Sequence, residues 1–291
     1  MMEQAERMRF AVVGDPIEHS LSPEVHLPVL CQFCKDVSYE KVHVKLSELD
    51  EWIDRVRRDE IDGFNVTMPL KSAIIPLLDR IEGDAGIFQS VNTVVNKNGR
   101  LYGYNTDGEG FSLSLLDKGF KLKDSNILLL GGGGAARTIA LKAALEGAGQ
   151  IIILGRTVCK VLEICSEVRK CNKKVKIRYG NLEDIVDHAK ATHILINATP
   201  LGMTGVPDDF EQLEFLNKLP HEVLVMDLVY EPPATRLLIR AKDQGLNTLN
   251  GLEMLIYQGI LADRLFLNMD LDLSSLHKSI IKRLEGKVGR I

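Results

Sequence analysis

Short runs of apolar residues alternate along the chain with longer segments in which apolar residues recur at helical spacing. Apolar runs of ~4–8 residues are typical of strands, and strands buried on both faces occur in parallel sheets that helices cover. A chain that alternates such strands with helices is predicted to have an α/β fold. The predicted strands of the second half are residues 126–131, 150–157, 193–200 and 222–230.

The first half alternates in the same way, but less regularly. Ser22 and Pro23 are typical of a helix start, as a capping residue and a first-turn proline. A long helix is predicted to begin at Gly251, and a last helix follows it. The other predicted elements are strands at 9–14, 39–46 and 64–66 and helices at 22–34, 47–58 and 69–78.

A β-hairpin is predicted around the Asn-Gly pair at residues 98–99. Asn-Gly favours a two-residue type I′ turn, in which both central residues have positive φ. Counting outward from this turn places Asn92 opposite Asn105. We therefore expect Asn92 and Asp107 to lie close together although they are far apart in sequence.

Composition narrows the class of protein. The chain has 291 residues, enough for two domains of ~100–200 residues each. Its net charge of −4 leaves no basic excess for nucleic-acid binding, and no apolar run approaches the ~20 residues of a membrane span. The polar N-terminus does not resemble a secretory signal. We expect a cytoplasmic protein that binds neither nucleic acid nor membranes.

The cysteines and histidines predict no metal site. The five cysteines are irregularly spaced, which favours reduced thiols in the cytoplasm. Cys31 and Cys34 lie where apolar residues recur at helical spacing, so both are interpreted as part of a buried helix face. No histidines repeat at metal-ligand spacing. His26 and His43 are most simply structural.

A glycine-rich turn at residues 131–136 follows a predicted strand and opens a predicted helix. Its pattern is G-x-G-x-x-A, in which the glycines allow a tight turn and close approach of a pyrophosphate. The N-terminus of the helix adds free N–H donors and a positive dipole end. A dinucleotide is the favoured ligand, while a methyltransferase site and a purely structural turn remain alternatives. The missing G-K-[ST] argues against a P-loop.

The end of the next strand favours NADP(H). In an NAD site an acidic residue bonds the ribose hydroxyls ~20 residues further on. Here Arg156 stands twenty positions after Ala136, followed by Thr157 and Lys160. A guanidinium can bind a 2′-phosphate through two parallel hydrogen bonds. A solvated arginine without a ligand is the alternative.

Neutral hydrogen-bonding residues gather at strand ends in the first half. They lie in four segments, residues 19–23, 65–71, 91–93 and 105–108. Hydroxyl and amide groups suit a polyhydroxylated ligand, and a pocket built to bond hydroxyls rejects analogues that lack them. Lys71 and Asp107 are the charged pair among these segments. The alternative for this pair is an ordinary surface ion pair.

These segments, in this order, resemble the shikimate dehydrogenase family. The motifs are Ser-x-Ser-Pro, Asn-Val-Thr-x-Pro-x-Lys, Val-Asn-Thr and Asn-Thr-Asp-Gly, then the glycine turn, Arg-Thr, Asn-Ala-Thr and a late Gln. The resemblance runs from about residue 10 to 260, and the whole ordered set is far more specific than any one motif. It implies a substrate domain at 1–107 and 251–291 and a Rossmann-type NADP domain at 108–250, with the active site in the cleft between them.

The resemblance also implies a role for each motif residue. Lys71 and Asp107 would be the catalytic pair. The substrate carboxylate would bind Ser20 and Ser22, and the ring hydroxyls would bind Asn65, Thr67, Asn92 and Gln258, with Tyr230 nearby. The cofactor would bind Gly131, Gly132, Gly133, Gly134, Ala135, Arg156, Thr157 and Lys160, with Thr199 and Gly251 at its nicotinamide end.

The reaction that the family implies is the reversible reduction of 3-dehydroshikimate to shikimate with NADPH, a step toward aromatic amino acids. The substrate is a small molecule, and a monomer or a homodimer is expected. Lys71 can stabilise negative charge that grows on the carbonyl oxygen and deliver the proton, while Asp107 orients it.

Three positions depart from the family pattern. Gly155 stands where the family has Asn, and Lys160 offers a point charge in place of a forked guanidinium group. Leu27 replaces an Asn at a position that we expect to face the packing of the first domain. The nearest rival is a quinate/shikimate dehydrogenase that uses NAD or NADP, but Thr157 is not the acidic residue expected for NAD. A non-catalytic shikimate or nucleotide sensor is the rival from another class, and the presence of both Lys71 and Asp107 argues against it.

Overall fold

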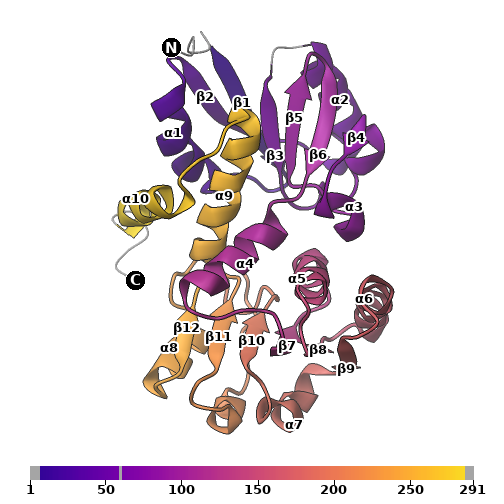
Figure 1. Cartoon of the computed structure of the whole chain (residues 1–291), viewed down its shortest axis with the longest axis vertical. Coiled ribbons are helices and arrows are strands. Elements are labelled where there is room, and N and C mark those ends of the chain that lie inside the picture. Colours follow the sequence, from indigo (N-terminus) through magenta and orange to yellow (C-terminus); the bar gives the residue numbers. More distant parts are fainter. Residues whose placement is uncertain (1–6, 59–60, 286–291) are drawn as a thin grey trace. The chain divides into compact units, whose positions relative to one another are not determined.

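A computed structural model of the chain describes residues 7–58 and 61–285. The described residues form two compact units, residues 7–110 with 256–284 (unit 1) and residues 111–255 (unit 2). The chain leaves unit 1 within helix α4 (Asp107–Asp117) and returns to it within helix α9 (Gly251–Leu267). Each unit is an α/β structure, which confirms the predicted fold class (Figure 1).

Unit 1 contains a mixed sheet of six strands in the order β2-β1-β3-β5-β6-β4. Strand β1 is parallel to both of its neighbours, β2 and β3, whereas β5 is antiparallel to β3 and to β6. In chain order the strands are β1 (Met8–Gly14), β2 (Val37–His43), β3 (Gly63–Val66), β4 (Arg80–Ile81), β5 (Thr93–Lys97) and β6 (Arg100–Tyr104).

The hairpin β5–β6 has the predicted register. Asn98 and Gly99 both have positive φ, 53° and 82°. Thr93 pairs with Tyr104, so the next position outward sets Asn92 opposite Asn105. Two residues of local sequence therefore fix which side chains meet at the far end of the hairpin.

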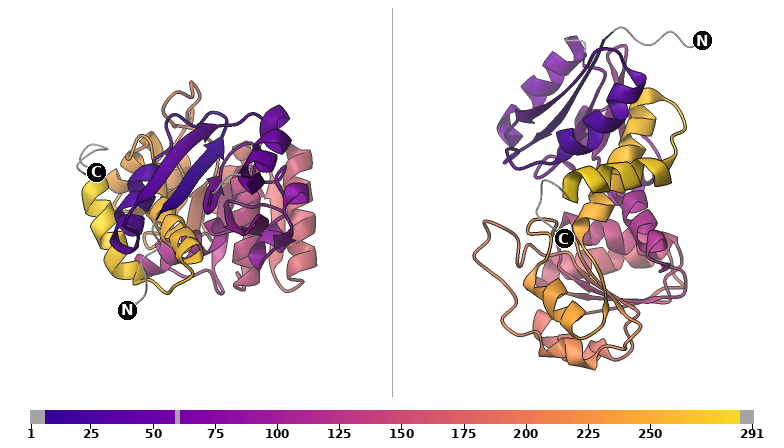
Figure 2. Two further views of the ribbon diagram at one scale, coloured as in Figure 1. Left: turned by 90° about the horizontal axis from the view of Figure 1, so that it is seen from above. Right: turned by 90° about the vertical axis from the view of Figure 1, so that its left-hand side faces the viewer.

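Alternate residues of β1 pack into two apolar clusters on opposite faces of the unit 1 sheet. Ala11 and Val13 belong to a cluster that includes helix α2 (Leu49–Arg58). Phe10 and Val12 belong to a second cluster, which also contains residues of α1 (Ser22–Phe33) and α9. Figure 2 shows α9 beside this sheet from two further directions. The remaining helices of unit 1 are α3 (Asp84–Phe88) and α10 (Leu273–Glu285), with 3₁₀ turns η1 (Leu46–Glu48) and η2 (Ile75–Leu77).

Three local expectations for the first half were wrong. The segment 69–78 forms successive turns and the short η2, because Pro76 has no N–H to continue a helical ladder. Ser22 is the first residue of α1, not its cap, and the cap position is Leu21. Cys34 is buried as predicted, but Cys31 is exposed.

Unit 2 contains six parallel strands in the order β12-β11-β10-β7-β8-β9. This is the doubly wound order of a Rossmann fold, with its switch point between β7 and β10. The strands are β7 (Asn126–Leu130), β8 (Gln150–Leu154), β9 (Lys176–Gly180), β10 (Ile194–Asn197), β11 (Leu224–Asp227) and β12 (Asn247–Leu249).

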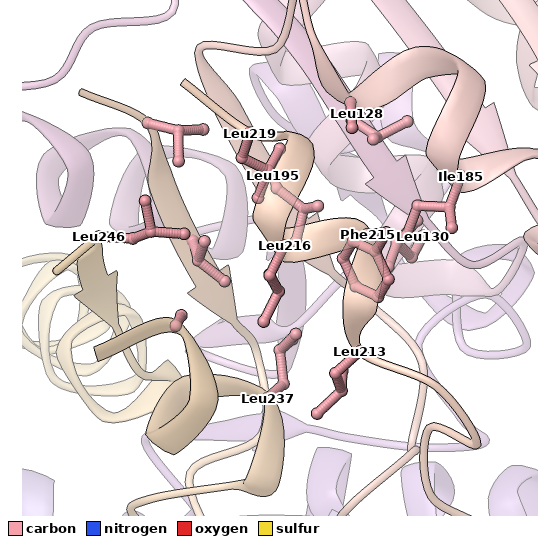
Figure 3. Packing of buried hydrophobic residues seen from close by; sticks show 14 of the residues in the cluster. Leu128, Leu130, Ile185, Leu195, Leu213, Phe215, Leu216, Leu219, Leu237 and Leu246 are labelled. Atoms are coloured by element: carbon pink, nitrogen blue, oxygen red, sulfur yellow. The ribbon is translucent and has the colours of Figure 1, made fainter. Parts of the chain in front are cut away.

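Helices cover both faces of the unit 2 sheet, as expected for parallel strands. On one face Leu128 and Leu130 pack with Phe215 and Leu237 in a buried cluster (Figure 3). Elements α7 (Ile185–Ala189), η4 (Glu214–Lys218) and α8 (Arg236–Asp243) contribute to this cluster, and η3 (Leu182–Asp184) precedes them. Helices α5 (Gly134–Leu145) and α6 (Val158–Cys171) lie on the other face (Figure 1). Within the described residues, no helix is long and apolar enough to span a membrane.

Candidate active site

A lysine and a carboxylate form a charged pair in unit 1. Lys71 lies in the turns after β3, and Asp107 is the first residue of α4. Lys71 Nζ and Asp107 Oδ2 are 2.6 Å apart, and the side chains are 29% and 14% exposed. Partial burial strengthens the attraction between these charges relative to a fully solvated pair, and both groups remain accessible to a ligand. An ammonium group in this position can act on a bound molecule.

Asn92 holds the second oxygen of the Asp107 carboxylate. Asn92 Nδ2 donates to Asp107 Oδ1 at 2.9 Å, so the other oxygen is directed to Lys71. The same nitrogen lies 2.9 Å from Thr106 Oγ1 and 3.0 Å from Gln258 Oε1. Asn92 is only 2% exposed, so the network that orients Asp107 is itself buried. The proximity of Asn92 and Asp107 that the hairpin register predicts is confirmed.

A glycine in α4 brings Gln258 into this network. A Cβ at Gly110 would lie 2.7 Å from the backbone nitrogen of Gln258, a distance that side-chain carbons do not tolerate. Gly110 therefore allows α4 and α9 to touch through their backbones. Gly110 could not be identified from the sequence, because nothing in the local pattern indicates which glycine meets another helix.

Asn65 is linked to Asn92 through the backbone of β5. Asn65 Nδ2 donates to the Asn92 carbonyl at 3.2 Å and to Thr93 Oγ1 at 3.1 Å. Its oxygen accepts a 2.7 Å hydrogen bond from the hydroxyl of Tyr39 on β2. Tyr39 could not be identified from the sequence, because the alternation of residues 39–46 places it on the face that carries the basic side chains of this predicted strand.

Ser20 and Ser22 form a small hydroxyl cluster after β1. Their Oγ atoms are 3.1 Å apart, and the Ser22 backbone N–H donates to Ser20 Oγ. Ser22 also reaches the Tyr39 hydroxyl, so this cluster and Asn65 share Tyr39 as a neighbour. Thr67 lies at the end of β3, and its backbone N–H donates to the Val13 carbonyl. Thr67 packs so closely against Gly14 that a Cβ there would lie 2.4 Å from its methyl carbon.

The glycine turn of unit 2 has the geometry that a pyrophosphate requires. Gly131 has a φ of 122°, and a Cβ on it would lie 2.9 Å from the Ala198 carbonyl oxygen. Helix α5 begins at Gly134, and a Cβ at Gly133 or Gly134 would meet no atom within 4 Å. Open space therefore lies before exposed N–H donors at a helix N-terminus, as anion binding requires. Among the remaining turn residues, Gly132 is half-buried, Ala135 is exposed and Ala136 is buried against the sheet.

Basic and hydroxyl groups lie at the end of β8. Arg156, Thr157 and Lys160 are all exposed, and Thr157 stands at the cap position of α6. Arg156 Nη1 is 3.6 Å from Asp208 Oδ2, an exposed pair that the sequence analysis did not predict. The donor set fits a phosphate group. A Cβ at Gly155 would lie 2.8 Å from the Val161 side chain, which gives a steric reason for glycine at this position.

Thr199 is held by a buried polar network at the ends of β10 and β11. Its N–H and hydroxyl donate to Asn197 Oδ1 at 3.0 and 2.6 Å. Asn197 Nδ2 in turn donates to Asp227 Oδ1, and Thr235 donates to Asp227 Oδ2. Burial raises the pKa of Asp227 to about 6, and its hydrogen bonds partly offset this.

The last two predicted site residues also lie in unit 2. Gly251 opens α9, where a Cβ would overlap the carbonyl oxygen of Leu228 at 2.0 Å. Tyr230 is half-buried, and burial raises the pKa of its phenol. The predicted residues thus separate into two groups. Unit 1 holds Ser20, Ser22, Asn65, Thr67, Lys71, Asn92, Asp107 and Gln258; unit 2 holds the glycine turn, Arg156, Thr157, Lys160, Thr199, Tyr230 and Gly251.

A Rossmann-type unit with a glycine turn, joined to a unit that carries a Lys–Asp pair among amides and hydroxyls, defines the class of two-domain dinucleotide-dependent dehydrogenases. The sequence profile of the shikimate dehydrogenase substrate-binding domain matches residues 12–94. The profile described as shikimate/quinate 5-dehydrogenase matches residues 114–228. The chain belongs to the shikimate dehydrogenase family.

Individual relatives match over nearly the whole chain. The NADP(+) shikimate dehydrogenase of Alkaliphilus metalliredigens is 40% identical over 274 residues, 94% of this chain and 96% of its own. The crystal structure of Thermus thermophilus shikimate 5-dehydrogenase with NADP(H) and shikimate superposes with a TM-score of 0.80 at 35% identity, covering 94% and 99% of the two chains. Quinate dehydrogenase from Corynebacterium glutamicum with NAD is more distant in sequence, at 25% identity, with a TM-score of 0.84 and coverage of 96% and 100%.

Proposed function

We propose that this protein catalyses the reversible reduction of 3-dehydroshikimate to shikimate with NADPH. The observation that carries the proposal is the Lys71–Asp107 pair, 2.6 Å apart and held by the buried amide of Asn92. A sensor that only binds its ligand has no need of a half-buried ammonium group with a dedicated carboxylate partner. The family membership and the named activities of its relatives support the same reaction.

Lys71 serves as the acid in the reduction. The bound nicotinamide supplies the hydride. Negative charge then grows on the carbonyl oxygen, where the Lys71 ammonium stabilises it and donates a proton. In the oxidation direction the neutral amine of Lys71 accepts the proton of the substrate hydroxyl. Asp107 orients Lys71, while Asn92 fixes the plane of the Asp107 carboxylate.

The remaining polar residues of unit 1 bind the substrate. Ser20 and Ser22 bind its carboxylate, and Asn65, Thr67, Asn92 and Gln258 bind its ring hydroxyls. Tyr230 is a further substrate-binding residue. Both amide hydrogens of Asn65 are engaged within the protein. Asn65 therefore offers the substrate its oxygen, which still has a lone pair after bonding Tyr39.

NADP(H) binds to unit 2. Residues Gly131 to Ala135 bind the pyrophosphate, because open space lies beside Gly133 and Gly134 at the N-terminus of α5. Arg156, Thr157 and Lys160 bind the 2′-phosphate, and Thr199 and Gly251 lie at the nicotinamide end. Residues 1–107 with 251–291 then constitute the substrate domain, and residues 108–250 the NADP domain. We place the reaction in the cytoplasm, on a small-molecule substrate, with the protein as a monomer or homodimer.

One assay tests the proposal against the quinate alternative. Purified protein is mixed with shikimate or quinate, each with NADP⁺ or NAD⁺, and the absorbance of the reduced nicotinamide is followed. Shikimate with NADP⁺ should give the largest kcat/KM. The absence of turnover in all four mixtures would refute the dehydrogenase function. A preference for quinate with NAD⁺ would instead assign the protein to the quinate branch.

A further inference from the structure

A histidine and a carboxylate are buried together in unit 1, away from the charged pair of the active site. His26 lies on α1 and Asp263 on α9, and neither is measurably exposed. His26 Nδ1 and Asp263 Oδ1 are 2.6 Å apart, so they share one hydrogen. A buried carboxylate is costly and stabilises a fold less well than apolar residues of similar volume. The pair therefore calls for a role beyond holding two helices together.

The two side chains bond to each other and to little else. Within residues 7–58 and 61–285, His26 Nε2 and Asp263 Oδ2 are buried without a hydrogen-bond partner. The single shared hydrogen bond consequently sets the orientation of the imidazole ring. Helix packing assists, because Gly259 lets α9 approach α1 so closely that a Cβ would lie 2.5 Å from Val25.

The oriented imidazole lies flat against Tyr39. The two ring centroids are 4.6 Å apart and the rings are 9° from parallel. Tyr39 is 6% exposed, so its ring has little freedom once His26 is in place. Its hydroxyl donates to Asn65 Oδ1 at 2.7 Å and reaches Ser22. One contact chain thus joins Asp263 to two of the residues proposed above to bind substrate.

We propose that Asp263 and His26 are positioning residues for the substrate site, which act by holding the Tyr39 hydroxyl against Asn65 and Ser22. The inference rests on the proposed function, since it needs Asn65 and Ser22 to bind substrate. Neither residue of the pair touches substrate. Loss of the pair should weaken shikimate binding and leave the dinucleotide unaffected, because the contact chain lies within unit 1.

The test compares Asp263→Leu with Asp263→Asn. Leucine has a similar volume but cannot accept the Nδ1 hydrogen, whereas asparagine retains an acceptor oxygen. We expect Asp263→Leu to raise the KM for shikimate about tenfold, the effect of one lost hydrogen bond to a buried group. The KM for NADP⁺ should change less than about twofold, and Asp263→Asn should restore most of the shikimate KM. If the pair has a purely structural role, Asp263→Leu should instead lower the active fraction of the protein and kcat, and the KM values for shikimate and NADP⁺ should both stay unchanged.

Tyr39→Phe gives a second, independent readout in a variant that preserves the ring. It should raise the shikimate KM by a similar factor, and Tyr39→Phe/Asp263→Leu should be no worse than Tyr39→Phe alone. An unchanged shikimate KM in Tyr39→Phe overturns the inference even if Asp263→Leu does not fold. If the double variant raises the shikimate KM by the product of the two single-variant factors, the two residues act independently, and the inference is overturned as well. Wild-type protein in the same assay tests the proposed function separately, because without shikimate turnover there the function itself fails.

Discussion

At the scale of single residues, the side chains around Lys71 are held in place by hydrogen bonds to one another. Asp107 bonds Asn92 through one oxygen and Lys71 through the other. The two amide hydrogens of Asn92 are shared among three acceptors, on Thr106, Asp107 and Gln258. Such a network is rigid because moving any member leaves a buried polar group unpaired. The side chain of Lys71 is thereby held in one position by its hydrogen bond to Asp107.

Replacing Lys71 should affect the chemical step more than binding. Lys71→Ala removes the proton donor, for which general acid–base catalysis accounts for ~10²–10⁴-fold in rate. We expect kcat in both directions to fall by about that factor, with the KM for NADP⁺ unchanged. Steady-state kinetics of this variant, with the exposed Lys123→Ala as a matched control, measure the effect. Undiminished turnover in Lys71→Ala would contradict the assignment.

Arg156 should decide the preference for the phosphorylated dinucleotide. Arg156→Ala removes a charge-assisted hydrogen bond to the 2′-phosphate, so the KM for NADP⁺ should rise about tenfold and that for NAD⁺ should change little. Asp208→Asn is the matched control of opposite sign, because it removes the carboxylate 3.6 Å from Arg156. It should lower the KM for NADP⁺ by about twofold, the weak effect of an exposed pair. Equal changes for both dinucleotides in Arg156→Ala would refute the phosphate role.

At the scale of helices and strands, glycines decide where two elements can touch. Gly110 allows α4 to meet α9, and Gly259 allows α9 to meet α1. The same helix therefore brings Gln258 to Asn92 and Asp263 to His26. Positions five residues apart on α9 serve two different parts of unit 1 because the helix is buried over most of its length.

Gly110→Ala should separate these helices and weaken substrate binding. The added carbon would lie 2.7–2.9 Å from the Gln258 backbone, and overpacking of this kind costs ~1–3 kcal/mol. We expect a lower melting temperature and a higher KM for shikimate, because Gln258 moves away from Asn92. Gly86→Ala in α3 is the matched control, since its Cβ would meet no atom within 4 Å. If both variants behave as wild type, the close approach at Gly110 is unimportant.

At the scale of the whole molecule, a buried carboxylate in each unit makes the stability of the fold depend on pH. Burial raises the pKa of Asp227 in unit 2 from 3.8 to about 6. Burial also raises the pKa of Asp263 in unit 1 to about 6, and His26 partly offsets this. For both groups the folded state binds the proton more tightly than the unfolded state. Their contribution to stability is therefore fully present below about pH 4 and is lost as pH rises through 6.

Asp227→Asn should reduce this dependence. Asparagine can accept from Asn197 and Val229 and can donate to Thr235 Oγ1, so the network survives without a titrating group. Between pH 4 and 7 the free energy of unfolding of wild type should fall relative to that of the variant by up to about 3 kcal/mol. Denaturant titrations across this range measure the difference, with the exposed Asp187→Asn as control. Parallel curves for wild type and Asp227→Asn would show that Asp227 does not titrate there.

Much of the fold and half of the site were predictable from local patterns. The strand–helix alternation indicated an α/β fold with a parallel sheet covered by helices, and the Asn-Gly turn placed Asn92 beside Asp107. The glycine turn lies where the pattern predicts, before α5. Each of these depends on residues close together in sequence, or on a register counted from them. The errors were local as well, since Pro76 prevented the helix that the apolar spacing of residues 69–78 favoured.

Packing between segments far apart in the sequence decided which residues orient the site. Tyr39 meets Asn65 because β2 and β3 flank the same strand, β1. Asp263 meets His26 across 237 positions of sequence. Neither partner is marked by its neighbours in the chain, because a hydrogen bond or a ring contact depends on distance in space and carries no periodicity. Local sequence therefore specifies the elements and the motif residues, whereas the residues that orient those motifs become visible once the helices and strands have packed.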